Sequence, residues 1–450
     1  MIRHRAPRSR LPKEFVVACA GAAILVWAPL PFASVPETFR LALVALFGAF
    51  VALAAACGGR VFPVVAPLAW VALLGAAPML GARFGSSWLD GVSAAPELSA
   101  RLAALWLGLA AFAAALAWAC RRRRARLVVA LGIVSASGVQ LTMAVLDRML
   151  GGGDSIWRVA VAPAGGRLRG TYVNPDHLAF LLLLALPLVA VWAARWMRRS
   201  GERGGNPLVA AVVPLALWSL FLLGVAATGS RAALAIAAVV GALQATVRLA
   251  RLGRGGRLLA SLLVVAAVGL PLILGPLGEG SALIRYAESS RYDLRFDQRW
   301  TVYRTTFALW LERPLLGHGL GAFREAFDRV QPESLQRDWW HAHSDPLELL
   351  ADVGLIGTVP LVLVWLALVV GLMRRRLGGA LRGDDGDLAE ALACSLLAGA
   401  AHCCVDFPLA NPANATAYLA LCAAAAGLLR AYRVEPATTS SGRPGTGAVA

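Results

Sequence analysis

Residues 177–197 read HLAFLLLLALPLVAVWAARWM, and this stretch decides the class of fold. It contains a single charged side chain, Arg195, and it has the length of about 20 residues that a helix needs to cross a bilayer. Comparable apolar runs lie at residues 15–35, 39–57, 61–80, 102–120, 127–147, 207–227, 232–248, 258–276, 353–373, 388–406 and 414–430. The sequence therefore predicts an all-α polytopic membrane protein with about 12 transmembrane helices.

The composition of the whole chain agrees with this prediction. Hydrophobic residues make up 58% of the 450 residues and charged residues 15%, and the mean hydropathy is +0.66. A soluble domain carries about 25% charged residues, so a soluble enzyme and a disordered protein are excluded. The seven cysteines lie mostly in apolar runs, without the paired spacing of a zinc or redox site. We expect them to be small core residues and not the framework of a disulfide-linked secreted fold.

The basic residues behind the net charge of +17 are placed in a regular relation to the predicted spans. If the N-terminus is cytoplasmic, the basic clusters fall at the inner ends of alternate spans, as the positive-inside rule requires. The excess charge therefore orients the protein and does not indicate nucleic-acid binding. The acidic pair Asp385 and Asp387 falls on the same side, where we expect a solvated loop. The inner clusters are Arg121–Arg124 with Arg126, Arg195–Arg203, Arg248–Arg257, Arg374–Arg382 and Arg430–Arg443.

The same threading puts one long hydrophilic segment, about 277–350, on the outer side together with all the histidines except His4. This segment contains nine arginines, which either pair with the acidic residues of the segment or bind an anionic ligand such as a diphosphate. Residues 434–450 are polar and predicted to be disordered. The nine arginines are Arg285, Arg291, Arg295, Arg299, Arg304, Arg313, Arg324, Arg329 and Arg337.

The stretch WWHAHSDP at 339–346 places His343 immediately before a predicted helix. A histidine there is either a solvated rim residue or a general base, and we expect Asp345 to orient its ring. His341 and His343 could also bind a metal ion, but no third ligand has a diagnostic spacing, so no metal is expected. Arg231 stands at an outer helix end without an adjacent acid, and an arginine at the membrane edge is functional by default.

Four motifs in a fixed order resemble those of the O-antigen ligase and polymerase superfamily of bacterial inner-membrane glycan enzymes. They are GTYVNPDHLA at 170–179, TGSRAAL at 228–234, the RW pair at 299–300 that precedes Pro314 and GHG at 317–319, and HS at 343–344 with GLIG at 354–357. DFPLANPAN at 406–414 also resembles the end motif of one branch. The similarity covers about residues 165–430. It suggests N-terminal helices at 1–164, a ligase-like membrane domain at 165–430 with its periplasmic loop at about 277–350, and a cytoplasmic tail at 431–450.

The resemblance implies a metal-independent inverting glycosyltransferase of the C type, without a cofactor, in the bacterial inner membrane. It would take a glycan from undecaprenyl diphosphate on the periplasmic side and join it to lipid A–core, to a growing polysaccharide or to protein. His343, Arg231 and Arg299 would be catalytic, with the histidine as base and the arginines at the diphosphate. Transport of an anion or a glycan is the alternative from another class. The residues expected to bind substrate are Arg169, Asn174, Arg304, His341 and Asp345.

Overall fold

The computed structural model describes residues 11–59, 65–83, 93–150, 166–249, 298–335 and 337–432. Within these ranges the regular structure is helical, and no strand occurs. In chain order the elements are α1 (Lys13–Trp27), η1 (Phe32–Ser34), α2 (Glu37–Ala56), α3 (Ala66–Arg83), α4 (Pro96–Ala119), α5 (Arg123–Met149), α6 (Pro175–Glu202), α7 (Pro207–Ala227), α8 (Arg231–Leu249), α12 (Arg299–Glu312), α13 (Phe323–Phe327), α14 (Asp345–Leu377), α15 (Gly383–Cys403), η5 (Pro408–Ala410) and α16 (Pro412–Ala431).

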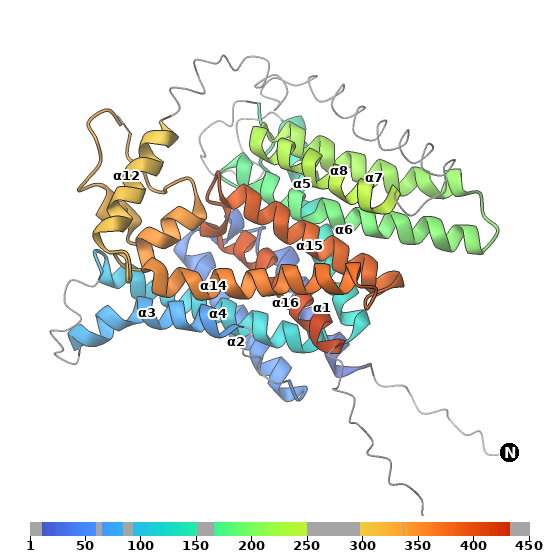
Figure 1. The fold of residues 1–450 in the computed structure, drawn as a ribbon, viewed down its shortest axis with the longest axis horizontal. Helices are drawn as coiled ribbons and strands as arrows, with labels where there is room; N and C mark the ends of the chain where they lie inside the picture. Colours follow the sequence, from blue (N-terminus) through green and yellow to red (C-terminus); the bar gives the residue numbers. More distant parts are fainter. Residues whose placement is uncertain are drawn as a thin grey trace, which may run out of the picture.

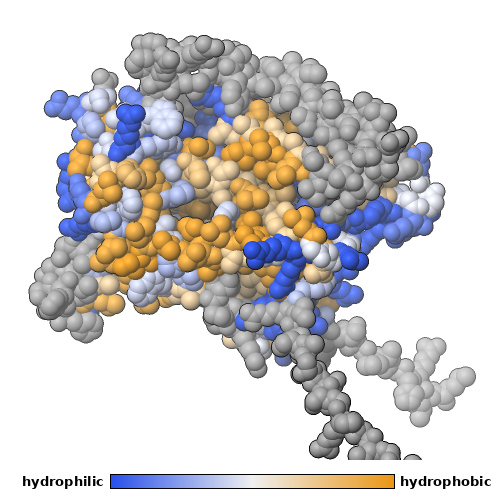
Figure 2. All heavy atoms as spheres, viewed as in Figure 1, coloured by the Kyte–Doolittle hydropathy of each residue, from blue (hydrophilic) through white to orange (hydrophobic). Residues whose placement is uncertain are grey.

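The long helices run side by side along one direction of the molecule (Figure 1). Hydrophilic side chains gather at the two ends of this bundle, and apolar side chains cover the part between them (Figure 2). Six of the helices in the described ranges are long and apolar enough to cross a membrane: α2, α4, α5, α6, α14 and α16. The protein is therefore an all-helical multi-pass membrane protein, as its sequence predicts.

Eleven of the twelve predicted spans coincide with helices of the described ranges. The apolar parts of α3, α7 and α8 are shorter than a full span, at Ala66–Leu80, Val212–Ala227 and Arg231–Ala245. The predicted span 258–276 lies outside the described residues, so the total of about 12 crossings stays a prediction. The first helix is also shorter than the run 15–35, because two prolines follow it and η1 turns the chain with positive φ angles at Phe32, Ala33 and Ser34.

The helices differ in how far they are enclosed by the rest of the bundle. In α6 and α16, 83% of the apolar window is buried, whereas the share is 33% in α14 and 22% in α2. The central position of α6 results from its packing against α5, α7, α8 and α15. An apolar helix surface that no other helix covers can face only lipid in a membrane. We therefore interpret α2 and α14 as peripheral helices with lipid-facing sides.

An acidic cluster at the start of α15, formed by Asp384, Asp385, Asp387 and Glu390, joins the ends of several helices. Asp387 is buried and lies 2.6 Å from Arg198 and 3.1 Å from Arg376, which also approaches Glu390 at 3.3 Å. Asp384 is paired with arginines of two helices: Arg123 of α5 and Arg195, Arg198 and Arg199 of α6. The prediction that Asp385 and Asp387 lie in a solvated loop is therefore wrong. These acids lie in the first two turns of α15, where buried arginines require counter-charges.

Arginines of three of the predicted inner clusters, those at 121–126, 195–203 and 374–382, therefore meet at one end of the bundle, while most of the clusters at 248–257 and 430–443 lies outside the described residues. Arg126 at the start of α5 lies 3.0 Å from Asp385, and Tyr432, just after α16, donates a hydrogen bond of 2.6 Å to the same carboxylate. The opposite end holds the starts of α6, α14 and α16 and the end of α15. Which of the two ends faces the cytoplasm stays a prediction.

The helix α14 is interrupted at Gly354, whose φ of 60° and ψ of −165° are not helical. The backbone groups freed by the break pair with the segment that precedes α13. The N–H groups of Leu355 and Ile356 donate to the carbonyls of Pro314 and Leu315 at 2.9 and 3.0 Å. In return, the carbonyl of Ala351 accepts from the N–H of His318 at 2.8 Å. The two main chains are so close that a Cβ on Gly354 would overlap the backbone of Leu315. We call this paired region the Gly354 clasp.

The described part of the predicted hydrophilic loop is a folded unit and not an extended segment. Helices α12 and α13 enclose a small hydrophobic core with Val302, Leu309, Phe323 and Phe327, and Ala351 of α14 packs against them. The arginines Arg285, Arg291 and Arg295 lie outside the described residues. Together with the Gly354 clasp, this core fixes the segment 298–345 against the end of the bundle where α14 begins.

Candidate functional site

The ring of Phe407, in the link between α15 and α16, is the centre of a histidine cluster. His341 stacks on it with ring centroids 4.2 Å apart and planes 16° apart. His343 and His177 approach it edge-on, at 4.7 Å and 88° and at 4.9 Å and 89°. The histidines come from the loop before α14 and from the first turn of α6. Three separate chain segments thus meet at one end of the bundle, which requires the whole fold to be in place.

The residue before Phe407, Asp406, supplies a buried carboxylate to this cluster. It is 3% exposed, and its Oδ1 lies 3.5 Å from Nδ1 of His343, a long contact without good hydrogen-bond geometry. Burial alone would raise the pKa of Asp406, but the interaction with His343 and the charges of His177 and His402 outweigh burial and lower it. The histidines around Asp406 therefore favour the charged form of its carboxylate.

His343 has a backbone conformation that few residues adopt. Its φ is +53°, and a non-glycine residue in this region costs on the order of 1 kcal/mol or more. The hydroxyl of Tyr303 in α12 donates a hydrogen bond of 2.9 Å to the carbonyl of His343. The indole of Trp339 contacts the imidazole edge-on, with centroids 5.3 Å apart. The surroundings therefore hold the half-buried ring of His343 in one orientation, beside Asp406.

His341 has a carboxylate partner of its own. Its Nδ1 lies 2.8 Å from Oε1 of Glu348, while Oε2 of Glu348 accepts a hydrogen bond of 2.8 Å from the N–H of Ala342. Burial lowers the pKa of His341, but the charge and the hydrogen bond of Glu348, together with the charge of Asp406, outweigh burial, so the net shift is upward. The cluster thus contains two histidine–carboxylate pairs on different sides of Phe407.

The catalytic arginines expected from the sequence both begin a helix. Arg299 is the first residue of α12 and donates from Nη1 to the carbonyl of Val405 at 3.3 Å. It is close enough to His402 for their charges to interact. Arg304, one turn further along α12, is exposed, and no hydrogen bond or ion pair joins it to the described residues. The structure therefore brings Arg299 to the Asp406 turn and leaves Arg304 outside it.

Arg231 is the half-buried first residue of α8, and an arginine that the sequence reasoning missed connects its turn to the cluster. Arg167 donates from Nε to the carbonyl of Thr228 at 2.6 Å, and its Nη2 forms an ion pair of 2.9 Å with Asp176 in the first turn of α6. His177 follows Asp176 directly. The turn at Thr228, just before Arg231, is thus tied to the helix start that carries one histidine of the cluster.

Other residues expected to bind substrate make local contacts near the same helix starts. The side chain of Asn174 accepts a hydrogen bond of 2.9 Å from the N–H of Asp176 and caps α6. Arg169 is buried just before this cap. We expected Asp345 to orient His343, but its Oδ2 instead accepts a hydrogen bond of 3.0 Å from the N–H of Leu409. The carboxylate beside His343 is Asp406, because the link 404–411 folds back over the start of α14.

The sequence contained one signal for the residues that were missed. Asp406 and Phe407 stand where the run 388–406 ends, ahead of the run 414–430, and the motif DFPLANPAN begins there without an assigned role. Asn414 shows how this stretch joins the rest of the site. It accepts a hydrogen bond of 2.9 Å from the hydroxyl of Tyr172 and donates one of 3.1 Å to the carbonyl of His177. Both NP motifs thus begin helices at the same end of the bundle.

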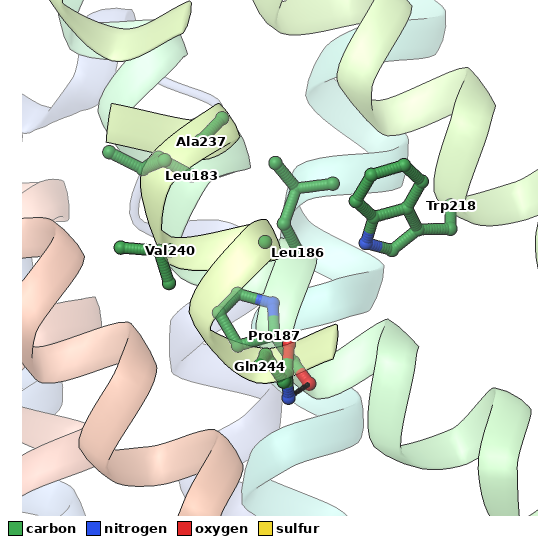
Figure 3. A pocket seen from close by; sticks show the side chains of 8 residues that line it. Leu183, Leu186, Pro187, Trp218, Ala237, Val240 and Gln244 are labelled. Carbon is green, nitrogen blue, oxygen red and sulfur yellow. Dashed lines mark hydrogen bonds between the residues drawn. The ribbon is translucent and has the colours of Figure 1, made fainter. Parts of the chain in front are cut away.

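Two further features of the described residues bear on ligands. No group of three or more His, Cys, Asp or Glu side chains in the described ranges is arranged to bind a metal ion. A small pocket between α6, α7 and α8 is lined by apolar side chains and Gln244 (Figure 3). The amide of Gln244 donates a hydrogen bond of 3.2 Å to the carbonyl of Pro187. This pocket shares no residue with the histidine cluster, and its lining offers no group for acid–base chemistry.

Residues 215–362 match the family described as O-antigen ligase. The matched segment runs from α7 into α14 and contains Arg231, Arg299, His341, His343 and the Gly354 clasp. No curated protein matches the chain. The match agrees with the resemblance seen in the sequence motifs: the segment from α7 into α14 is similar to the O-antigen ligase family.

Proposed function

We propose that the protein transfers a glycan from undecaprenyl diphosphate to an acceptor hydroxyl at the periplasmic face of the inner membrane, with O-antigen ligation or polymerisation as the reaction. The observation that carries the proposal is the pairing of His343 with the buried anion Asp406 at the turn that Arg299 also contacts. A base and a guanidinium group thus both contact the turn at 405–406, in a chain whose segment 215–362 is similar to the O-antigen ligase family.

In this proposal His343 removes the proton from the acceptor hydroxyl. The hydroxyl oxygen then forms a bond to the anomeric carbon of the donor while the bond from that carbon to the diphosphate oxygen breaks. Attack opposite the leaving group inverts the anomeric centre. The electron pair of the broken bond stays on undecaprenyl diphosphate, and the proton stays on His343 until it passes to water. Asp406 stabilises the imidazolium through its charge.

Arg299 and Arg231 stabilise the charge that develops on the leaving diphosphate. Guanidinium groups suit this role because their planar array of donors matches phosphate oxygens and remains charged at every physiological pH. A diphosphate is a good leaving group and needs charge stabilisation more than a proton. Metal ions would not be required, and the reaction should proceed in the presence of EDTA.

The test is glycan transfer in proteoliposomes from a synthetic undecaprenyl-diphosphate glycan to an acceptor glycan. We expect His343→Asn to lower the rate by on the order of 10²–10⁴, the usual contribution of a positioned base. Asparagine tolerates a positive φ better than most residues, so this variant removes the base without disturbing the turn. His343→Ala serves as the second variant, and membrane abundance is matched throughout.

The arginines are tested by Arg299→Lys and Arg231→Lys, which keep the charge and lose the planar array of donors. We expect each to lower the rate by about 10-fold or more. Arg329→Lys is the matched control, since Arg329 is exposed and away from the cluster. Full transfer by His343→Asn would contradict the role as base. Anion or glycan flux that depends on the arginines, without any transfer, would identify a transporter instead.

A further inference from the structure

Helix α12 differs from the long helices in direction. It runs across them at the end of the bundle where α14 begins, and it packs against α14 (Figure 1). When the long helices cross a membrane, α12 lies along the membrane plane at the level of its surface. This holds for either orientation of the protein in the bilayer.

The two sides of α12 have different surroundings. Val302, Thr306 and Leu309 face the small core under the helix and are buried. The opposite side presents Trp300, Phe307 and Leu311, which are 60%, 50% and 55% exposed, with the exposed Arg304 between them. These four residues are spaced by four, three and four positions, so they form one stripe along the helix. We call them the α12 stripe.

The α12 stripe continues into the apolar surface of α14. Leu315 and Leu316 follow the helix and are 57% and 46% exposed. The Gly354 clasp then places them beside Leu355 and Ile356 of α14, because it pairs the backbones of 314–315 and 355–356. These two are also exposed, at 37% and 39%, and they belong to the apolar part of α14, of which only 33% is buried among the described residues.

The chemistry of the α12 stripe suits the boundary between lipid headgroups and acyl chains. Tryptophan is enriched at this level, and a surface helix with aromatic and leucine side chains on one face inserts that face into the boundary. Arg304 stands in the same stripe, where a guanidinium group can bind lipid phosphate. A patch continuous with lipid-facing residues is covered by the same bilayer, without a further protein.

We propose that α12 is an interfacial helix whose stripe is embedded in the bilayer surface. The lipid is thereby a structural support of the site, because the first residue of α12 is Arg299, whose guanidinium group reaches Val405 beside Asp406. The same helix supplies Tyr303, whose hydroxyl holds the carbonyl of His343. The proposal concerns the position of α12 and does not depend on the reaction that the site performs.

The experiment uses the full-length protein in lipid nanodiscs, with its native cysteines replaced and one nitroxide label introduced. The labels are placed at Phe307→Cys and Leu311→Cys in the stripe, and at Ala308→Cys and Glu312→Cys on the flank beside it. Collisions with oxygen report lipid, and collisions with a water-soluble nickel chelate report solvent. We expect the oxygen-to-nickel ratio to be several-fold higher at 307 and 311 than at 308 and 312.

A second measurement avoids cysteine substitution altogether. In nanodiscs of brominated phosphatidylcholine, Trp300→Phe should remove a lipid-quenched part of the tryptophan emission, whereas Trp339→Phe, which replaces a ring packed against His343, should not. Equal quenching in both variants would overturn the proposal. Water-like collision ratios at 307 and 311 would also overturn it, and so would protection of both positions from both reagents, since the stripe would then be covered by protein.

Discussion

His341 and His343 are two residues apart, yet each faces a different carboxylate. Glu348 lies 2.8 Å from His341, while Asp406 lies 3.5 Å from His343. The tighter pair has both oxygens of its carboxylate engaged, since Glu348 also accepts from the backbone of Ala342. This pair is therefore suited to holding the loop in place, and the looser pair of His343 is the one for which we propose proton transfer.

The Glu348→Gln variant tests the holding role through the pH dependence of stability. The raised pKa of His341 means that the folded state binds its proton more tightly than the unfolded state. The stabilisation is complete below about pH 6.5 and is lost as the pH rises through the higher folded pKa. We expect Glu348→Gln to lower the unfolding temperature in detergent at pH 6, corresponding to about 1 kcal/mol or more, and to have less effect at pH 9.

The control for this prediction is Glu312→Gln, which changes an exposed carboxylate at the end of α12. Its effect should be small at both pH values. A Glu348→Gln variant whose destabilisation is the same at pH 6 and pH 9 would show that the charge of His341 does not contribute to stability.

The individual residues of the site were predictable to different degrees. His343, Arg231 and Arg299 stand in short sequence motifs, so the sequence suggests roles for them. Asp406 was not assigned a role, because its contact with His343 spans 63 positions and depends on how the last link folds back over α14. Asp345 was chosen in its place because sequence proximity was the only available guide.

At the scale of elements, the interruption of α14 explains why glycines occur at fixed places in two motifs. Gly317 and Gly354 both have positive φ, at 69° and 60°, and each would overlap the backbone of the facing segment if it carried a Cβ. The glycines in these motifs therefore allow two segments of the same chain to approach each other closely, in addition to forming turns. The close contact between the two segments fixes the position of residues 314–319 along α14, and thereby also the position of α12.

The Gly354→Ala variant should accordingly destabilise the protein by about 2 kcal/mol or more, through a strained backbone and loss of the Gly354 clasp. Gly48→Ala in α2 is the matched control, because no atom lies within 4 Å of the added Cβ. That change should be neutral or stabilising by up to about 1 kcal/mol. Thermal unfolding in detergent measures both, and equal unfolding temperatures would argue against a structural role for the clasp.

Hydropathy predicted most helices of the bundle because an apolar run of about 20 residues has few alternatives in a bilayer. The helices α12 and α13 are outside the bundle, in the segment 277–350 that hydropathy marks only as hydrophilic. Their apolar residues bury only a small core, and a short amphipathic helix has a weak signal beside a span. The early end of α1 was missed because the apolar run continues through the prolines.

At the scale of the molecule, the charges at the start of α15 hold together helices that are far apart in the chain. Asp387→Asn would leave Arg376, which is 6% exposed at its side chain, without full compensation. Removing one partner of a buried ion pair costs about 3–5 kcal/mol, so we expect a large fall in unfolding temperature or loss of folded protein. Glu37→Gln breaks the exposed pair with Arg101 and should cost less than about 1 kcal/mol. Similar losses in the two variants would contradict the prediction.

The orientation of the bundle is tested by labelling two exposed positions at its opposite ends. In a cysteine-free version, Ser334→Cys near the site should react with an impermeant maleimide in right-side-out vesicles, and Glu202→Cys at the arginine end should react only after the membrane is permeabilised. The reverse pattern would place the histidine cluster in the cytoplasm and rule out a periplasmic reaction.

The position of α15 near the C-terminus has a consequence for biosynthesis. One end of this helix carries the acids that neutralise arginines of α5, α6 and α14, and the link after its other end carries Asp406 and Phe407. A nascent chain that stops before α15 therefore has unpaired charges at one end and histidines without their central ring at the other. The site can assemble only when the last helices have been inserted, so an unfinished chain in the membrane lacks the arrangement needed to act on a substrate.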